Sequence, residues 1–253
     1  MIEREDVGTD GRIAVLRLAH GPVSAMDLEL CEAVTEQLRG LVADPARAVV
    51  LTGTGSSFSA GVDLRRILDG GPDYVKRFFP ALAEMFQVAF ELAKPVVAAV
   101  NGHAIAGGCV FAATADVTLM AEGKGRIGLP EIKVGVPFPR IALEVMRYAV
   151  GEVGYRRLVL GARTHTAADA HAMGLVDHVV DPAGLLPRAV EIAEGLAADV
   201  PADTFAATKT QLRRESLERT ARYADEDETG IALWSRRATD GWIARYLESV
   251  TRR

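Results

Sequence analysis

The sequence predicts an α/β fold with a helical C-terminal third. Its first half alternates short apolar strands with amphipathic helices, a pattern typical of strand and helix units packed around a shared sheet. From residue 140 onward the spacing of apolar residues is mostly helical. The length of 253 residues fits one large domain, or a core domain with a helical extension.

The composition limits the classes of partner that we expect. Apolar residues make up 49% and charged residues 25% of the chain, which is ordinary for a globular protein. The net charge of -5 argues against a nucleic-acid binder, whose affinity depends on neutralising phosphates. A small anionic ligand stays possible, because a few local arginines suffice to bind it.

No segment of the sequence predicts a membrane span or a secretion signal. A spanning helix needs about 18 consecutive apolar residues, and no such window occurs. The N-terminus carries acidic residues and no apolar leader segment. Cys31 and Cys109 are isolated and lack metal-site spacing, so we expect no disulfide and no metal centre. These features indicate a protein of the reducing cytoplasm.

The elements follow in order from local patterns. Apolar runs predict strands over residues 13–18, 48–51, 96–100, 117–120 and 126–128. Helical spacing of apolar residues predicts amphipathic helices over 28–41 and 78–92, the second beginning after the Gly-Gly-Pro sequence at 70–72. A short apolar helix is predicted to begin at Gly107 and to end near Thr114.

Residues 49–64 run from a buried strand through a glycine-containing loop into the start of a helix. Backbone N–H groups at such a start point outward and can bind an anion or an oxyanion. Gly61 permits backbone conformations that other residues avoid, and Asp63 can cap the following helix. Local physics alone leaves a plain capped helix equally open.

Two other motifs are matched only in part in this loop. The glycines at 53 and 55 begin a dinucleotide-binding fingerprint, but Phe58 occupies the place of its last glycine. Ser59 lies where a nucleophile elbow would place its serine, but Ser57 replaces the leading glycine. We therefore expect neither a dinucleotide site nor a serine hydrolase.

Residues 101–110 form a second segment of small residues after a buried strand. Small side chains let another backbone or a ligand approach closely. Gly107 begins the predicted helix, so its N–H group is a second candidate donor to an anion. His103 is interpreted as structural, since a lone loop histidine is weak support for catalysis.

Residues 128–137 contain a lone carboxylate, Glu131, in an apolar stretch after a predicted strand. If this side chain is buried, its pKa should rise, as suits a group that moves a proton near neutral pH. The residues alone leave two alternatives open: a surface glutamate, or a glutamate at a helix start after Pro130.

These three segments lie in the order, and at about the separations, of the crotonase (enoyl-CoA hydratase/isomerase) family, which the chain resembles from about residue 21 to 212. Residues 58–64 resemble its signature of Phe, a small residue, Ala-Gly, any residue and Asp-Leu. The second segment resembles its Asn-Gly-x-Ala-x-Gly-Gly-Gly stretch, with Ala106 in place of the first of three glycines. Residues 130–135 resemble its Pro-Glu-x-x-x-Gly stretch.

The resemblance implies an architecture and an assembly. It implies a spiral of β-β-α turns, which we place at residues 1–195, and a C-terminal helical region for trimerisation at 196–253. It also implies a homotrimer or a hexamer made of paired trimers. The substrate implied is a thioester of coenzyme A, and no permanently bound cofactor is expected.

The same resemblance assigns roles to residues. The N–H groups of Val62 and Gly107 would form an oxyanion hole for a thioester enolate, and Glu131 would be the acid–base residue. Arg65 and Arg66 are looser candidates for the phosphates of coenzyme A. The remaining residues implied to bind the substrate or its coenzyme A part are Ser24, Ala25, Met26, Ala60, Asp63, Leu64, Ile105 and Pro130.

One departure from the family pattern bears on the reaction. Hydratases of the family hold a water molecule between two glutamates, of which the second corresponds to Glu131 and the first to Val110. A single carboxylate can still move a proton between C2 and C4 of an enoyl thioester, but it delivers hydroxide to C3 poorly. We therefore favour a 3-enoyl/2-enoyl-CoA isomerase, with a 2-enoyl-CoA hydratase, another acyl-CoA reaction and a non-catalytic acyl-CoA binder as alternatives.

Overall fold

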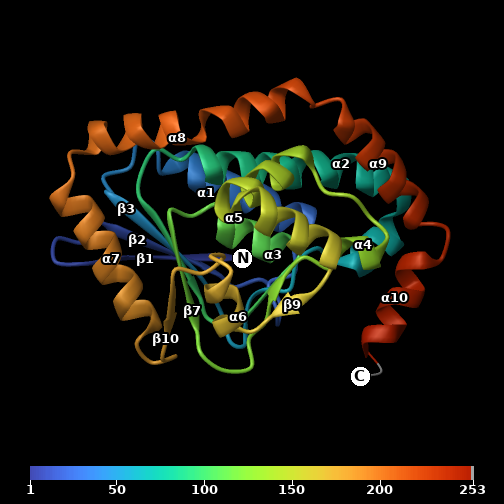
Figure 1. Ribbon diagram of the computed structural model, residues 1–253, viewed down its shortest axis with the longest axis horizontal. Coiled ribbons are helices and arrows are strands. Elements are labelled where there is room, and N and C mark those ends of the chain that lie inside the picture. Colours follow the sequence, from blue (N-terminus) through green and yellow to red (C-terminus); the bar gives the residue numbers. More distant parts are fainter. Residues whose placement is uncertain (252–253) are drawn as a thin grey trace.

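The computed structural model describes residues 1–251 and contains two sheets (Figure 1). In the larger sheet β1 pairs with β2 in antiparallel fashion, and β2, β3, β5, β7 and β10 then follow one another in parallel. Its strands, in spatial order, are β1 (Ile2–Val7), β2 (Ile13–Leu18), β3 (Ala48–Gly53), β5 (Val96–Val100), β7 (Val117–Ala121) and β10 (His178–Val180).

Three strands of the smaller sheet, β4, β6 and β8, each follow a strand of the larger one in the chain, and β9 follows helix α5. Three of its members are parallel, and the fourth pairs with β8 in antiparallel fashion. The chain thus makes successive strand–strand–helix turns, β3-β4-α2, β5-β6-α3 and β7-β8-α4, and the predicted spiral is confirmed. These strands are β4 (Ser57–Ser59), β6 (His103–Ile105), β8 (Ile127–Gly128) and β9 (Thr164–His165).

The parallel strands of the larger sheet are covered by helices on both faces, which explains their nearly continuous apolar sequences. Alternate residues such as Val15 and Val50 pack against Ala189 and Ala193 of α7, whereas Leu16 and other residues of the opposite face pack toward α1 and α2. The helices that follow the strands are α1 (Leu28–Gly40), α2 (Leu64–Glu91), α3 (Gly107–Ala113), α4 (Glu131–Val134) and α5 (Arg140–Gly161).

Helix α2 begins well before the helix predicted at 78–92. Asp63 caps it, because its carboxylate accepts the N–H groups of Arg65 at 3.0 Å and Arg66 at 3.1 Å. The Gly-Gly-Pro sequence, which predicted a helix start, instead divides one long helix in two. Gly71 has a φ of 59°, outside the helical region, so the chain bends there and resumes the helix at Pro72.

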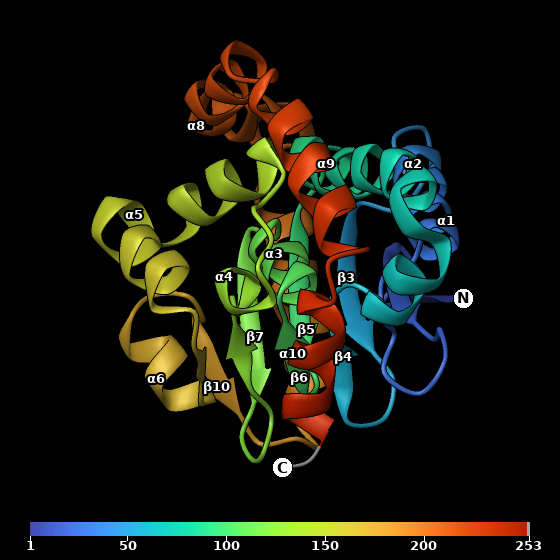
Figure 2. The same cartoon turned by 90° about the vertical axis from the view of Figure 1, so that its right-hand side faces the viewer.

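The last third of the described chain is mainly helical, as predicted. Figure 2 shows α9 and α10 leading from α8 back along the molecule, and they pack on α2 and α4. Residue 195, our predicted boundary, falls inside α7, and residues 252–253 of the predicted region lie outside the described part. These helices are α6 (Ala167–Ala172), α7 (Leu185–Asp199), α8 (Ala202–Arg222), α9 (Glu226–Arg237) and α10 (Trp242–Thr251).

Two cations of α8 are buried within this chain. Lys209 and Arg213 each bind a carboxylate oxygen of Asp116 at 2.7 Å. Arg213 is only 2% exposed, and its guanidinium lies over the ring of Phe90. The paired carboxylate makes burial of these charges tolerable and fixes α8 to the core. No helix of residues 1–251 combines the length and apolar character needed to cross a membrane.

Candidate active site

A cavity of about 550 Å³ lies where the chain leaves the parallel strands β4, β6 and β8 at their carboxyl ends. Ligands of α/β sheets commonly bind at this end of the strands. The wall combines the three segments singled out in the sequence with α9 and α10, and it consists of Pro22, Val23, Ala25, Ala60, Val62, Asp63, Leu64, Arg65, Ile105, Ala106, Pro130, Glu131, Val134, Val136, Trp234, Tyr246, Leu247 and Val250.

The strand register explains why these distant segments meet. Ser59 of β4 pairs with Ala104 of β6, and Ile105 pairs with Gly128 of β8. The residues that follow each strand therefore emerge side by side at one edge of the smaller sheet. Close backbone packing is needed there: Gly61 has a φ of 82°, and a Cβ atom on it would lie 2.4 Å from the carbonyl oxygen of Ile105.

A second void of about 20 Å³, here called the inner void, adjoins this cavity, because Val62, Glu131 and Trp234 line both. Gly107 and Val110 also line the inner void. The N–H groups of Val62 and Gly107 donate to no acceptor within residues 1–251. The peptide groups next to Val62 are bound to Met26, which holds this loop in place: Met26 donates to the Gly61 oxygen at 2.7 Å. Two free backbone donors near a carboxyl group can stabilise an oxyanion.

Ala106, the residue that departs from the family's glycines, precedes the second of these donors. Its φ of 53° and ψ of -123° are unusual for a residue with a side chain. Such a conformation costs about 1–3 kcal/mol and persists where the surroundings hold it. The N–H of Ala106 donates to the oxygen of Gly128 at 2.8 Å, so β8 fixes the peptide that turns into α3.

Glu131 is the first residue of α4 and is only 6% exposed. Its Oε2 atom is buried and has no hydrogen-bond partner among the described residues. Burial raises the pKa of this carboxyl group to about 8, opposed by a hydrogen bond to its own backbone N–H. The surface-glutamate alternative is therefore wrong, whereas a glutamate at a helix start after Pro130 is confirmed. A carboxyl group with this pKa can both release and accept a proton near neutral pH.

Most of the residues expected to bind the substrate lie on the cavity wall, and three do not. Ser24 is buried, and its hydroxyl donates to the Leu18 oxygen at 3.1 Å. Met26 is buried in the core, where a Cβ on Gly107 would lie 2.8 Å from its sulfur. The residues on the wall are Ala25, Ala60, Asp63, Leu64, Arg65, Ile105 and Pro130.

The two arginines proposed for phosphates differ in their surroundings. Arg65 lies on the cavity wall and is exposed. Arg66 is the third expected residue that does not line the cavity. It forms an ion pair with Glu29, and its guanidinium lies 5.5 Å from the centre of the Tyr74 ring. Arg65 is thus the better placed of the two for an anionic group entering this cavity.

The sequence analysis missed the part of the wall that the C-terminal helices supply. Trp234 of α9 is buried, and its indole N–H donates to the Pro137 oxygen at 2.9 Å. Tyr246 and Val250 come from α10, more than a hundred residues after Glu131 in the chain. The helical spacing of apolar residues in 243–250 was the available signal, but it does not say which face of the core the helix covers.

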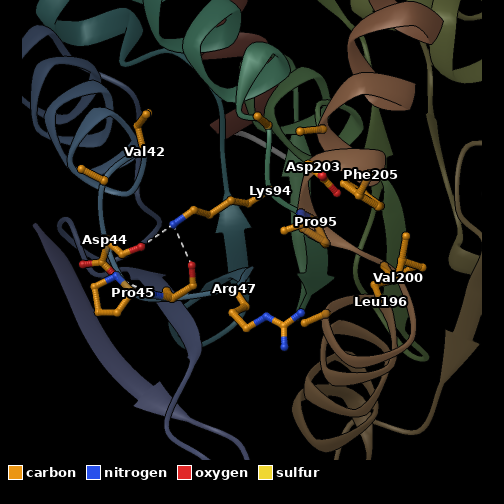
Figure 3. A pocket seen from close by; sticks show the side chains of 16 residues that line it. Val42, Asp44, Pro45, Arg47, Lys94, Pro95, Leu196, Val200, Asp203 and Phe205 are labelled. Atoms are coloured by element: carbon orange, nitrogen blue, oxygen red, sulfur yellow. Dashed lines mark hydrogen bonds between the residues drawn. The ribbon is translucent and has the colours of Figure 1, made fainter.

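Another cavity, of about 440 Å³, lies at the amino ends of β3 and β5, between the loops that precede them and helices α7 and α8 (Figure 3). Lys94 donates to the main-chain oxygens of Asp44 and Ala46, each at 2.7 Å. This lysine ties two loops together, and burial lowers its pKa. None of the three motif segments reaches this cavity, so we place the active site in the first one.

Comparisons with known proteins give the family of the chain. Residues 8–241 match the sequence profile of the family described as Enoyl-CoA hydratase/isomerase. A putative enoyl-CoA hydratase of Thermus thermophilus is 38% identical over 193 residues, which cover 75% of this chain and 73% of that protein. The human mitochondrial enoyl-CoA delta isomerase 1 is 27% identical over 243 residues, covering 94% and 80%.

The fold is also that of a solved structure. The human mitochondrial delta3-delta2-enoyl-CoA isomerase superposes with a TM-score of 0.88 at 24% identity, over 99% of this chain and 98% of that one. At 24% identity this similarity shows that the two proteins share a fold. The profile match over residues 8–241 shows that the sequence itself is related to the family. The chain therefore belongs to the enoyl-CoA hydratase/isomerase family and has the crotonase fold.

Proposed function

We propose that this protein is a 3-enoyl/2-enoyl-CoA isomerase. The proposal rests on the lining of the inner void. Among the described residues that line it, Glu131 is the one with an ionisable side chain. Val110, at the position that corresponds to the second glutamate of hydratases, lines the same void and is buried. An apolar side chain there neither binds nor polarises a water molecule for attack at C3.

The proposed reaction moves one proton within the substrate. Ionised Glu131 removes a proton from C2 of the 3-enoyl thioester, and the electron pair spreads over the thioester oxygen and C4. The N–H groups of Val62 and Gly107 stabilise the negative oxygen. Glu131 then returns the proton to C4, which leaves the double bond between C2 and C3 and regenerates the ionised base.

Coenzyme A enters the proposal as part of the substrate, without a permanently bound cofactor. Its acyl end would occupy the space beside Glu131, and Arg65 at the cavity wall would bind a phosphate. We further propose that the protein works in the cytoplasm as a trimer or hexamer. The family membership supports both the thioester substrate and the assembly.

Hydration of a 2-enoyl-CoA is the second candidate, because relatives such as the Thermus thermophilus protein carry the name hydratase. In that case a residue other than Val110 supplies the second polar group. A non-catalytic acyl-CoA binder is disfavoured, since binding alone does not require a buried carboxyl group with a pKa of about 8.

The test compares the wild-type protein on a 3-enoyl-CoA and a 2-enoyl-CoA. We expect isomerisation without fast hydration, and a loss of about 10²–10⁴ in rate for Glu131→Gln, which keeps the shape and removes the base. Val110→Glu should introduce hydration, and Val110→Gln, of similar size but uncharged, should not. Fast hydration by the wild type without isomerisation would contradict the proposal.

A further inference from the structure

Helix α10 is fixed onto the helix that carries Glu131. The indole N–H of Trp242 donates to the oxygen of Lys133 in α4 at 3.1 Å. Gly135, which ends α4, leaves room for this ring, because a Cβ atom there would lie 2.7 Å from it. Tyr246 follows Trp242 by four residues and so projects from the same face of α10, into the cavity that Glu131 lines.

Tyr246 and Glu131 each have an unused hydrogen-bonding atom. The Tyr246 side chain is half-buried, and within residues 1–251 its hydroxyl has no hydrogen-bond partner. The Glu131 Oε2 atom has none either. The two groups also lie within electrostatic reach of each other: burial raises the pKa of Tyr246, and the charge of Glu131 raises it further.

Three other polar side chains that line this cavity or lie near Glu131 have partners within residues 1–251. Cys109 of α3 lies near Glu131, but its buried thiol is bound to the backbone of Gly128. Asp63 accepts the first N–H groups of α2, and the Trp234 indole donates to a carbonyl. Arg65 is exposed, and we assign it to the coenzyme A phosphates. An ionised, buried carboxylate with one oxygen left unpaired is costly, so a hydroxyl at this wall can stabilise it.

We propose that Tyr246 is a positioning residue for Glu131: its hydroxyl donates a hydrogen bond, directly or through one water molecule, to the ionised carboxylate. This bond orients the base toward the substrate and stabilises its charged form in an otherwise apolar site. The inference rests on the proposed function, since it concerns the base of that same reaction. Tyr246 keeps its own proton throughout.

The first test is the pH profile of kcat/KM for Tyr246→Phe, which keeps the ring and removes the hydroxyl. Loss of a donor to the charged form raises the pKa of Glu131, so the acidic limb should move up by about one pH unit or more. At pH values below the limb, kcat/KM should fall about tenfold. The matched control is Tyr223→Phe, whose ring packs on Arg140 away from the cavity and whose limb should not move.

The second test needs no turnover. Carbon NMR of protein labelled at its glutamate carboxyl carbons, with the Glu131 signal identified by its loss in Glu131→Gln, measures the pKa directly. The same upward shift is expected in Tyr246→Phe. If the wild type turns over no acyl-CoA, the proposed reaction fails, while this titration still decides the role of Tyr246. An unchanged Glu131 pKa in folded Tyr246→Phe overturns the inference, as does a lower kcat/KM with an unmoved limb.

Discussion

The carboxyl group of Glu131 has a pKa of about 8 because the fold removes it from water, and desolvation is the largest cause of the shift. A neighbouring carboxylate would have the same effect, but Val110 is the residue beside it in the inner void. At the residue scale, then, a single buried acid surrounded by apolar groups suits proton transfer within the substrate. Among the described residues that line the inner void, no second carboxyl group accompanies Glu131.

This raised pKa links stability to pH. The folded-state value lies above the ordinary carboxyl value of 4.5, so the folded protein keeps a proton that the unfolded chain loses between these values. The stabilising contribution is complete below pH 4.5 and is lost as the pH rises through about 8. Between pH 5 and 9, the free energy of unfolding of the wild type should fall relative to that of Glu131→Gln by an amount on the order of 4 kcal/mol.

Urea unfolding of both proteins at several pH values measures this difference. Asp73→Asn, a substitution at an exposed position of α2, serves as the control. Its difference in unfolding free energy from the wild type should stay constant across this pH range. A constant difference between wild type and Glu131→Gln from pH 5 to 9 would show that Glu131 titrates normally.

At the scale of elements, helices far from the site determine its shape. Helix α8 is anchored by Lys209 and Arg213, which share Asp116. It leads to α9 and α10, which close the cavity with Trp234 and Tyr246. A loss of the anchor therefore affects both the stability of the core and the C-terminal wall of the site.

Removal of Asp116 tests this anchor. In Asp116→Ala two buried cations lose their common carboxylate, and such unpaired buried charges cost about 3 kcal/mol or more. The free energy of unfolding in urea should fall by that amount. Asp73→Ala removes an exposed ion pair with Lys76 and should change it by about 0.5 kcal/mol or less. Equal effects of the two substitutions would show that Asp116 does not anchor α8.

At the scale of the whole molecule, the parallel strands separate two ends with different properties. Their carboxyl ends carry the three loops that line the site, and the amino ends of β3 and β5 border the cavity that Lys94 braces. The surface also exposes large apolar side chains, such as Leu160 of α5 and Leu212 of α8. Single exposed leucines also occur on monomeric proteins, so the mass in solution decides whether these lie between subunits.

We expect the protein to assemble in solution. Light scattering should give a mass of three or six times 27.0 kDa. Leu212→Lys, which places a charge on exposed α8, should weaken the assembly if this helix lies in an interface, whereas Lys124→Ala, in the turn after β7, should leave the mass unchanged. A stable monomer of wild type at micromolar concentration would contradict the predicted trimer.

Much of the larger sheet could be predicted from local sequence. The strands at 13–18 and 96–100 coincide with β2 and β5, because apolar runs between turn residues predict buried parallel strands. Strands β4 and β6 were missed. Each is only three residues long and lies within a loop of small residues, so its pairing depends on partners distant in the chain.

The sequence by itself determined the family, the α/β class and the identity of the single carboxylate, Glu131, because these depend on motifs and on periodic patterns along the chain. Only the tertiary structure decided that Glu131 is buried with a raised pKa, and that α10 brings Tyr246 to the same cavity. Burial is set by all the segments that surround a residue. Segments more than a hundred residues apart meet through packing, which no local pattern specifies.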